Sequence, residues 1–378
     1  MNSLETPFGT VQLLRYPEVA RRRDLRAWDA ADEYLLHHAY SEHAHLLGER
    51  QPLVVNDEYG ALACSLLQYN PISWGDSYTS HLAAEENVAA NSLAGKLTAL
   101  DSLSTPAGIF KLVLLKIPRT VALLEHQLAV LKPHLEQDSV LVGAGMLKYM
   151  PASVFRAFER YIGPVKTSLA RKKARLIHCS PDTSIPAQGS PYPVSYQTDC
   201  LDIPLSSHAN VFSRNRIDNG TRFLLSKLEN MSAPVDQVID LACGNGILGL
   251  CLQRRFSDAQ VLFTDASYMA VASARDNYRR LIPDPQASAQ FQVQFALQNQ
   301  KSATADLIVC NPPFHEAHAV ADNVARSLFV DAHRCLRSGQ LWVVANNHLG
   351  YKSVLQKLFG NCRVVASDGR YVVLCANR

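Results

Sequence analysis

A glycine turn between a β-branched run and an apolar helix start constrains the fold of this chain more than any other stretch. Residues 238–250 read Val-Ile-Asp-Leu-Ala-Cys-Gly-Asn-Gly-Ile-Leu-Gly-Leu. This order predicts a strand that reaches Asp240, a tight turn through Gly244 and Gly246, and a helix directly after the turn. Glycines in such a turn tolerate positive φ and let a ligand approach the backbone, where the N–H groups of the helix start can meet it.

Two further predicted strands also end in polar residues. The run 261–264 is followed by Asp265, and the run 306–310 leads into Asn-Pro-Pro-Phe at 311–314. Open α/β sheets bind their ligands at the carboxyl ends of the strands, so we expect these three strand ends to line one site. The C-terminal half therefore reads as a Rossmann-like α/β domain.

The N-terminal half repeats the landmarks of the C-terminal half. Four of its residues precede counterparts by about 190 positions; the pairs are Gly60 and Gly246, Asp76 and Asp265, Asn87 and Asn277, and Pro118 and Pro312. Any two doubly wound domains share some of this spacing, but the conserved order favours one ancestral α/β domain present twice. At 378 residues the chain is also long enough for two domains.

We expect the boundary in the proline-rich stretch 180–206, which gives domains 1–189 and 190–378, with a short hairpin over 194–203. The two copies differ where chemistry belongs. The first has one glycine in its turn, and it carries Lys-Ile-Pro-Arg at 116–119 where the second has Asn-Pro-Pro-Phe. We therefore interpret the N-terminal copy as degenerate, with a docking rather than a catalytic role.

Composition excludes several classes of protein. Nine cysteines without a CxxC pair indicate free thiols in a reducing compartment, and no metal-ligand spacing is present. The first ten residues lack an apolar signal region, and the apolar runs are of strand length. We expect a cytoplasmic protein with no membrane segment and no metal. A net charge of +3 is too small by itself to indicate nucleic acid.

The Gly-x-Gly-x-x-Gly pattern of 244–249, with Asp265 placed to hold ribose hydroxyls, fits either a nicotinamide dinucleotide or S-adenosylmethionine (SAM). Asp240 favours SAM. A carboxylate at the end of the first strand attracts the methionine ammonium of SAM, whereas it repels a diphosphate. A hydride-transferring enzyme would also need an acid or base at the third strand end, where this chain has two prolines.

The Asn-Pro-Pro-Phe motif indicates the chemistry. Prolines make the backbone rigid and remove N–H donors, so the loop offers acceptors only. An exocyclic amine needs two acceptors, which the side-chain oxygen of Asn311 and the carbonyl of Pro312 can supply, while Phe314 stacks on the ring. Orientation and hydrogen bonding then localise the lone pair of the amine towards a methyl donor, and no strong base is needed. Without a ligand, Pro312-Pro313 would be only a rigid loop start.

These motifs together resemble the class I SAM-dependent amino-methyltransferases. Val-Phe-Ser-Arg at 211–214, with Asp218, Gly220 and Arg222, then resembles the guanine-N2 methyltransferases of ribosomal RNA, a family with a duplicated domain and an inactive N-terminal copy. Within that family, residues 27–36, 56–62 and 172–177 look most like the large-subunit (23S) enzyme. The catalytic residues implied by the resemblance are Asn311, Pro312, Pro313 and Phe314. Those implied for SAM are Asp240, Ala242, Gly244, Asn245, Gly246, Asp265, Ala266, Ala296 and Asn311.

One position departs from the family pattern. Ala296 follows the predicted strand 291–295, where an Asp or Asn often holds the adenine amine, so backbone groups or stacking must hold it here. His315 and His318 follow the motif, and we interpret them as helix-start or phosphate-contact residues rather than catalytic ones.

A local basic cluster is the candidate RNA surface. From Arg156 to Arg175 the chain has seven Lys or Arg residues against Glu159 alone. Such a run can be a solvated surface, but it also suits phosphate contacts. The candidate RNA-binding residues are Arg171, Lys172, Lys173, Arg175, Phe212 and Arg214. Because the N2 of a paired guanine faces the minor groove, the target base must be unpaired or flipped, with Phe212 as a candidate lid.

Rival interpretations remain open at this stage. The same reaction on 16S RNA is the nearest alternative. Enzymes that methylate a glutamine amide of release factors share Asn-Pro-Pro, but they usually carry Tyr next and a helical N-terminal domain. A DNA adenine-N6 methyltransferase would show a target-recognition domain, and a non-catalytic RNA-binding assembly protein would not need an intact motif. We expect a monomer.

Overall fold

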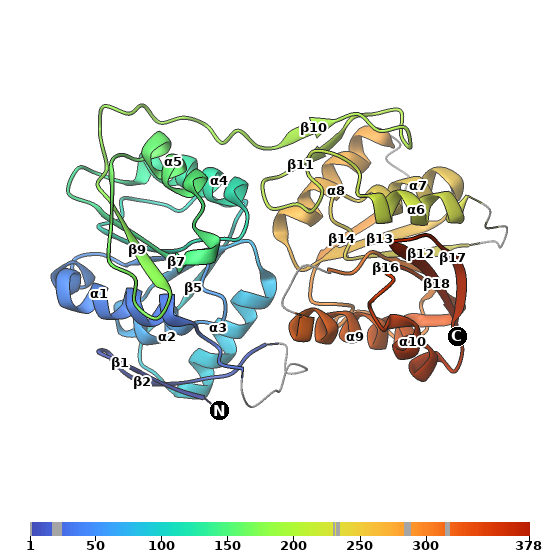
Figure 1. Cartoon of the computed structure of the whole chain (residues 1–378), viewed down its shortest axis with the longest axis horizontal. Helices are drawn as coiled ribbons and strands as arrows, with labels where there is room; N and C mark the ends of the chain where they lie inside the picture. Colours follow the sequence, from blue (N-terminus) through green and yellow to red (C-terminus); the bar gives the residue numbers. More distant parts are fainter. Residues whose placement is uncertain (1, 17–24, 230, 232–234, 283–288, 314–317) are drawn as a thin grey trace. The chain divides into compact units, whose positions relative to one another are not determined.

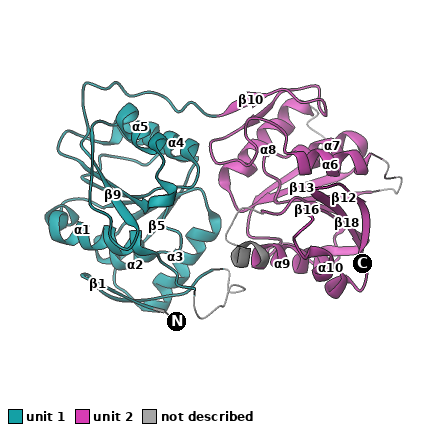
Figure 2. Ribbon diagram, in the orientation of Figure 1, with its two compact units in different colours: residues 1–192 teal, residues 193–378 magenta. Residues whose placement is uncertain are grey.

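A computed structural model describes residues 2–16, 25–229, 231, 235–282, 289–313 and 318–378. The chain forms two compact units, Met1–Tyr192 and Pro193–Arg378 (Figure 2). Each unit contains a seven-stranded mixed sheet with helices on both faces. The predicted tandem of Rossmann-like α/β domains is therefore confirmed.

In unit 1 the sheet has the strand order β5-β4-β3-β6-β7-β9-β8, in which β9 pairs antiparallel with both β7 and β8 and the other pairs are parallel. Its strands are β3 (Leu53–Val55), β4 (Ile72–Gly75), β5 (Thr98–Asp101), β6 (Leu112–Lys116), β7 (Val140–Met146), β8 (Val165–Thr167) and β9 (Ala174–Cys179). The α-helices in the described part are α1 (Ala30–Leu47), α2 (Ala61–Ser65), α3 (Tyr78–Asn91), α4 (Val121–Leu131) and α5 (Ala152–Tyr161). A hairpin of β1 (Asn2–Thr6) and β2 (Gly9–Leu13) precedes them.

Unit 2 repeats this order as β14-β13-β12-β15-β16-β18-β17. Its sheet strands are β12 (Gln237–Leu241), β13 (Gln260–Asp265), β14 (Ala289–Val293), β15 (Ala305–Cys310), β16 (Leu336–Asn346), β17 (Arg363–Ser367) and β18 (Tyr371–Asn377). The α-helices in its described part are α6 (Asn219–Leu228), α7 (Ile247–Arg255), α8 (Tyr268–Leu281), α9 (His318–Cys335) and α10 (Tyr351–Phe359). Unit 2 also begins with a hairpin, of β10 (Val194–Tyr196) and β11 (Leu205–Ser207).

Each sheet is buried between two helical layers. In unit 1, α1 and α2 pack with the hairpin on one face, and α4 and α5 pack on the other. In unit 2, α6, α7 and α8 cover one face, and α9 and α10 lie on the opposite face (Figure 1). Parallel strands covered on both sides carry unbroken apolar runs, as in β6, whose first four residues are all buried.

The expected hairpin over 194–203 is misplaced at its second arm. The structure pairs β10 with β11, which begins at Leu205. Leu205 and Ser207 are fully buried, and the backbone N–H of Ser206 donates to the side chain of Asn277 in α8. Packing onto α8 therefore selects the later segment, and a turn-rich sequence carries no signal for such a contact.

The glycines that begin α2 and α7 serve helix packing. Gly60 and Gly246 both have positive φ, at 82° and 85°. A Cβ at Gly246 would lie 2.9 Å from the Cβ of Ala274 in α8, and one at Gly60 would lie 2.7 Å from the Cα of Ala84 in α3. Glycine therefore lets each helix pair pack closely, in addition to shaping the turn.

An asparagine clamp is repeated in the two units. In unit 2, Asn277 bonds both backbone groups of Ser206 in the hairpin and also the carbonyl oxygen of Asn245 in the glycine turn. In unit 1, Asn87 bonds both backbone groups of Leu14 and the carbonyl oxygen of Tyr59. The same element pair is joined by the same side chain, which supports a duplication.

The register shifts two of the predicted landmark pairs by one residue. Lys116 stands at the position of Asn311, so Pro118 corresponds to Pro313 rather than Pro312. The pair of Asp76 and Asp265 is shifted as well. Val55 pairs with Trp74 in unit 1, and its counterpart Leu241 pairs with Thr264 in unit 2. The strand end at Asp265 therefore corresponds to Gly75, and Asp76 lies one position further on. The spacing alone missed this single-residue shift because the preceding loops differ in length.

All nine cysteines are free thiols. Among the residues that the structure describes, no helix is both long and apolar enough to cross a lipid bilayer.

Candidate functional site

The three polar strand ends of unit 2 lie together at one edge of the sheet. Leu241 of β12 pairs with Thr264 of β13 on one side and with Cys310 of β15 on the other. The strand order reverses between β12 and β15, and the crevice outside such a switch point is where open α/β sheets bind ligands. The turn after β12, Asp265 and Asn311 therefore lie at neighbouring strand ends on one edge of the sheet.

The turn after β12 is open on its ligand side at one position. Gly244 has a φ of 55°, and a Cβ there would have no atom within 4 Å. Asp265 braces this turn, since its Oδ2 accepts from the N–H of Gly244 at 3.1 Å and its Oδ1 accepts from Ser267 at 3.0 Å. Ala242 also has positive φ, at 59°. The backbone here is shaped for a close approach.

Asp240 lies fully buried beneath the turn. Its Oδ2 accepts from the N–H of Gly249 at 2.8 Å, while its Oδ1 has no hydrogen-bond partner among the described residues. Burial raises the pKa of this carboxyl to about 8. The nearby charge of Asp265 also raises the pKa, whereas the hydrogen bond from Gly249 lowers it. An orphaned acceptor in this place fits a cationic group such as the ammonium of SAM.

We expect Asp240→Asn to change how stability depends on pH. The folded carboxyl titrates near 8, whereas the unfolded one titrates near its ordinary value of about 3.9. Between these values the folded state binds more protons, so wild-type stability falls as pH rises, by up to about 1.4 kcal/mol per unit. The variant has no carboxyl at this position, so its stability should not fall with pH for this reason. Thermal unfolding without SAM from pH 5 to 8 should show the two stability curves diverging, and parallel curves would contradict the assignment.

Three other predicted cofactor residues contribute backbone rather than polar side chains to this edge. The side chain of Asn245 donates to Tyr196 Oη and Ser207 Oγ in the hairpin, both at 3.2 Å, and so is already engaged. Ala266 is half-buried after β13. Ala296 is 5% exposed and has a φ of 48°. Their roles in cofactor binding stay predictions.

Asn311, directly after β15, is held from one side. Its Nδ2 donates to Thr221 Oγ1 at 2.8 Å and to Asp218 Oδ2 at 3.3 Å, both at the start of α6. Its Oδ1 is buried and has no partner among the described residues. Pro312 is buried and Pro313 is exposed. Phe314 and His315 lie outside the described residues, as does the side chain of His318.

The thiols at this edge are not nucleophiles. Burial raises the pKa of Cys243 and of Cys310 well above the ordinary range, and the charges of Asp240 and Asp265 add to the effect. Both thiols are therefore neutral at physiological pH. The arrangement suits transfer of an activated group onto a bound amine rather than covalent catalysis by cysteine.

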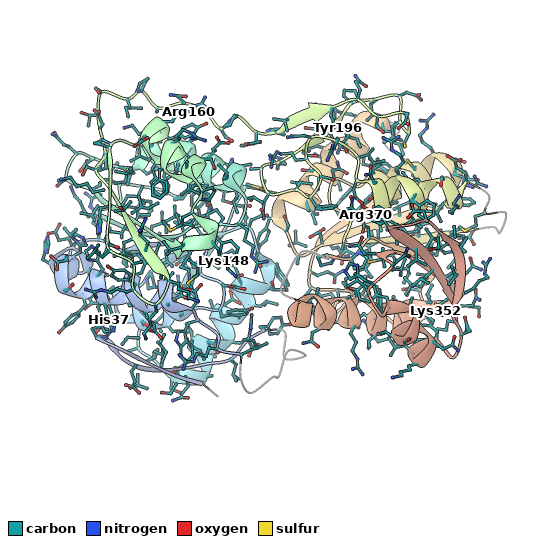
Figure 3. The ribbon with its side chains drawn as sticks, in the orientation of Figure 1. His37, Lys148, Arg160, Tyr196, Lys352 and Arg370 are labelled. Carbon is teal, nitrogen blue, oxygen red and sulfur yellow. The ribbon has the colours of Figure 1, made fainter. Side chains whose placement is uncertain are left out.

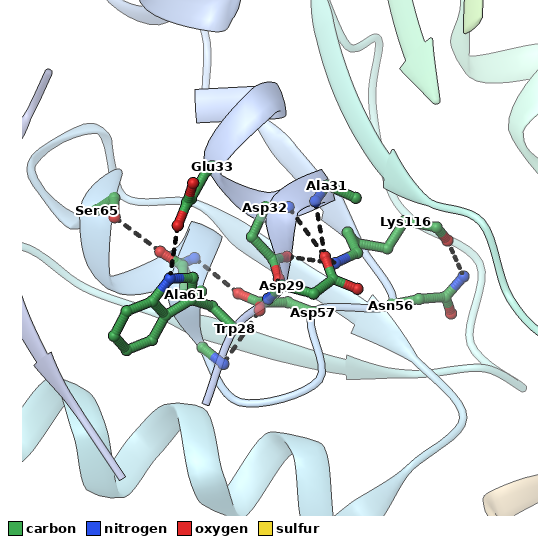
Figure 4. Close-up of polar contacts among 12 residues, drawn as sticks. Trp28, Asp29, Ala31, Asp32, Glu33, Asn56, Asp57, Ala61, Ser65 and Lys116 are labelled. Carbon is green, nitrogen blue, oxygen red and sulfur yellow. Dashed lines mark hydrogen bonds and ion pairs between the residues drawn. The ribbon is translucent and has the colours of Figure 1, made fainter. Parts of the chain in front are cut away.

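Unit 1 has lost these features at the equivalent positions. The register places Val54 where unit 2 has Asp240, Gly75 where it has Asp265, and Lys116 where it has Asn311. Lys116 Nζ contacts Asp29 Oδ1 at 2.8 Å and Asp32 Oδ1 at 2.7 Å (Figure 4). Burial alone would lower the pKa of Lys116, but the two carboxylates raise it, so the lysine is charged.

The predicted RNA-binding cluster of unit 1 forms the turn between β8 and β9. Lys172 and Lys173 occupy a two-residue turn with φ of 48° and 66°, closed by reciprocal backbone bonds between Arg171 and Ala174. Lys172 Nζ pairs with Glu33 at 2.6 Å, and the guanidinium of Arg171 lies 4.8 Å from the ring centre of Tyr34. Lys173 is exposed and makes no ion pair within the described chain. Arg175 is half-buried in β9.

The same edge carries a cation–aromatic group that sequence reasoning missed. Lys148 Nζ lies 4.6 Å and Arg119 Cζ lies 5.8 Å from the ring centre of Tyr149, after β7 and β6 (Figure 3 labels Lys148). The N–H of Leu147 donates to the carbonyl of Lys173, so this group adjoins the basic turn. Two surface clefts of about 510 and 480 Å³ are lined in part by Lys172 and Arg171 respectively. The only signal for this group in the sequence is the pair Lys148-Tyr149 shortly after a predicted strand.

The loop before α6 holds the other two RNA candidates. Phe212 is 48% exposed, as a base-stacking residue needs to be. Arg214 Nη1 donates to the carbonyl of Ala209 at 2.7 Å, which braces the loop itself. Within the described residues, no cluster of three or more His, Cys, Asp or Glu is arranged to hold a metal ion.

Comparison with known proteins matches both units. The family model described as RLMG N-terminal domain matches residues 1–183, and the model described as Methyltransferase small domain matches 202–375. Ribosomal RNA large subunit methyltransferase G of Aeromonas salmonicida is 41% identical over 375 residues, which covers 99% of this chain and 98% of the relative. The protein of the same name from Streptomyces avermitilis is 40% identical over 380 residues, covering 99% and 98%.

A solved structure shares the whole fold. It is described as a T. thermophilus 16S rRNA N2 methyltransferase, RsmC, in complex with AdoMet and guanosine. The TM-score is 0.74 at 21% identity, with coverage of 100% of this chain and 97% of the other. At this identity the likeness establishes the shared architecture of the two chains.

Proposed function

The chain belongs to the family of ribosomal RNA large subunit methyltransferase G, and we propose that it transfers the methyl group of SAM to the exocyclic N2 of a guanine in 23S ribosomal RNA. The observation that carries the proposal is the buried Oδ1 of Asn311 at the end of β15, which has no hydrogen-bond partner among the described residues. An acceptor in this place can take a hydrogen bond from a substrate amine. The neighbouring turn leaves open space at Gly244, which supports a ligand there.

The residues of the chain act mainly by orientation. The guanine N2 amine donates its two hydrogens to Asn311 Oδ1 and to the carbonyl of Pro312, which turns its lone pair out of conjugation with the ring. Held by these residues, SAM would be the methyl donor and would leave as its thioether, and the methylated amine would release one proton to water. We assign ring stacking to Phe314 and the lid role to Phe212.

We assign cofactor contacts to the residues predicted from the sequence. The backbone of 242–246 and the carboxyls of Asp240 and Asp265 hold SAM, with Ala266 and Ala296 beside the adenosine. The half 190–378 is the catalytic domain, and 1–189 docks RNA. Val54, Gly75 and Lys116 stand in unit 1 at the positions of Asp240, Asp265 and Asn311, which supports this division. We further propose that the protein is a cytoplasmic monomer.

RNA docking should depend unequally on the two lysines of the basic turn. We expect Lys173→Ala to raise the KM for RNA about threefold to tenfold and to lower the slope of log K against log salt by about 0.7–0.9, the value of one phosphate contact. Lys172→Ala is the matched control. Because Lys172 already pairs with Glu33, its loss should change KM less. Equal effects of the two substitutions would contradict a phosphate role specific to Lys173.

The function is tested by methyl transfer from labelled SAM to ribosomal RNA from cells that lack the gene, with 23S and 16S assayed separately. Label recovered from 23S as N2-methylguanosine supports the proposal. Label in 16S keeps the chemistry and refutes the choice of subunit. Label in a release factor instead, or RNA binding without any label, would replace the proposal with one of those alternatives.

A further inference from the structure

We propose that Asp218 and Thr221, on the first turn of α6, are positioning residues that orient the amide of Asn311. The inference rests on the proposed function and goes beyond it, because neither residue touches the reacting atoms. Their task is to decide which end of the Asn311 amide faces the substrate.

The orientation follows from what each group can donate. A carboxylate accepts hydrogen bonds only, so Asp218 must face the NH₂ end of the amide. Thr221 Oγ1 accepts from the same Nδ2 at 2.8 Å, and Thr221 is only 6% exposed. The Oδ1 end is therefore turned away from α6. A flipped amide would present two hydrogens to an amine that also donates, and the substrate contact would be lost.

One carboxylate oxygen joins two elements that are distant in the sequence. Asp218 Oδ2 accepts from the backbone N–H of Thr221 at 3.0 Å, which caps α6, and it also accepts from Asn311 Nδ2. The residues Asp218 and Asn311 are 93 positions apart. The cap of the helix and the orientation of the amide are thus set by one side chain, so the helix start is coupled to the end of β15.

Unit 1 offers an internal comparison. Asp29 caps α1 and Asp32 follows at the same three-residue spacing as Thr221 after Asp218, and both contact Lys116 at the position of Asn311 (Figure 4). The contact between helix start and strand end is present in both copies. In unit 1 this contact is made by the ammonium of Lys116, which can only donate hydrogen bonds and so presents no acceptor to a ligand. In unit 2 the Nδ2 of the neutral Asn311 amide donates to residues at the start of α6, and its Oδ1 can accept a hydrogen bond from another group.

The test compares Thr221→Val, which keeps the β-branched shape, with Thr221→Ser, which keeps the hydroxyl. We expect Thr221→Val to lower kcat about 10-fold, the equivalent of one lost hydrogen bond, with the Kd for SAM and the KM for RNA within twofold. Thr221→Ser should retain near wild-type kcat. Asp218→Ser keeps a helix cap but is too short to reach Asn311, and should also lower kcat about 10-fold, whereas Asp218→Asn keeps an oxygen there and should retain most of the rate.

A double-mutant cycle separates positioning from general structure. In an Asn311→Ala background, Thr221→Val should have no further effect on kcat, because there is no amide left to orient. Full additivity, or a wild-type kcat for Thr221→Val alone, would overturn the proposal. So would a Thr221→Ser variant as slow as Thr221→Val.

A second measurement does not depend on the RNA reaction. The side-chain NH₂ signals of Asn311, assigned by their absence in Asn311→Ala, should exchange slowly with solvent in wild type and at least 10-fold faster in Thr221→Val. If wild type methylates no RNA while this difference is seen, the proposed function fails and the positioning stands. If activity is present and the exchange rates are equal, the positioning fails alone.

Discussion

Asn311→Ala lowers the rate of methyl transfer to RNA by about 10³-fold, the effect expected when a preorganised hydrogen-bonding group is removed from a reacting centre. The substitution deletes the buried Oδ1 acceptor after β15 and leaves the turn after β12 intact. Because Asn311 is also among the residues assigned to SAM, we expect the Kd for SAM to rise, but by a much smaller factor than the rate falls. Single-turnover methylation with labelled SAM measures the rate, and calorimetry measures the affinity.

Asn311→Gln is the informative control for that prediction. It keeps an amide but carries it one methylene further from the strand end, so the amide no longer occupies the position from which Asn311 bonds Asp218 and Thr221. We expect a rate between those of wild type and Asn311→Ala. A variant Asn311→Ala that kept more than a tenth of the wild-type rate would remove Asn311 from the reaction.

Lys116→Met destabilises unit 1 by about 3–5 kcal/mol, the usual cost of leaving a buried charge without its partner. Asp32 is 7% exposed at its side chain and Asp29 is 45% exposed, so the carboxyl of Asp32 bears most of the cost. Urea unfolding followed by the fluorescence of Trp74, which is fully buried in unit 1, should show the midpoint falling. Unit 2 should still bind SAM with the wild-type Kd.

Neutralising the partners should reverse most of this loss. The triple variant Lys116→Met, Asp29→Asn, Asp32→Asn removes both carboxyls that contact Lys116, and asparagine retains the helix cap of α1. The buried carboxyl of Asp57 stays, and it accepts hydrogen bonds from the N–H groups of Gly60 and Ala63. We expect its unfolding midpoint to lie close to that of wild type. If Lys116→Met alone left the midpoint unchanged, the ion cluster would have no structural role.

Much of the fold could be predicted because buried parallel strands have a recognisable sequence pattern. The runs at 112–116, 238–241 and 306–310 are nearly all apolar and end at polar turns, and each is a strand of a sheet covered on both faces. Short elements were harder. The hairpin arm β11 is set by its contact with Asn277, 71 positions away from Ser206, which no local pattern reports.

The candidate site divides in the same way. Its position at the strand ends follows from the motifs, since topology brings carboxyl ends of parallel strands together. The partners of its side chains do not follow. Asn245 turns to the hairpin, Gly246 is required by Ala274, and Asn311 is held by Asp218 and Thr221. Each of these contacts crosses between elements, so spacing along the chain cannot reveal it.

The asparagine clamp has a consequence for the timing of synthesis. In each unit the hairpin leaves the ribosome first, and its clamp follows later: Asn87 comes 73 residues after Leu14, and Asn277 comes 71 after Ser206. At a translation rate of roughly 5–20 residues per second, each hairpin waits about 4–15 s for its partner. During that interval its backbone groups are satisfied by water or by a chaperone, and the nascent chain passes through the vulnerable state twice, once for each copy.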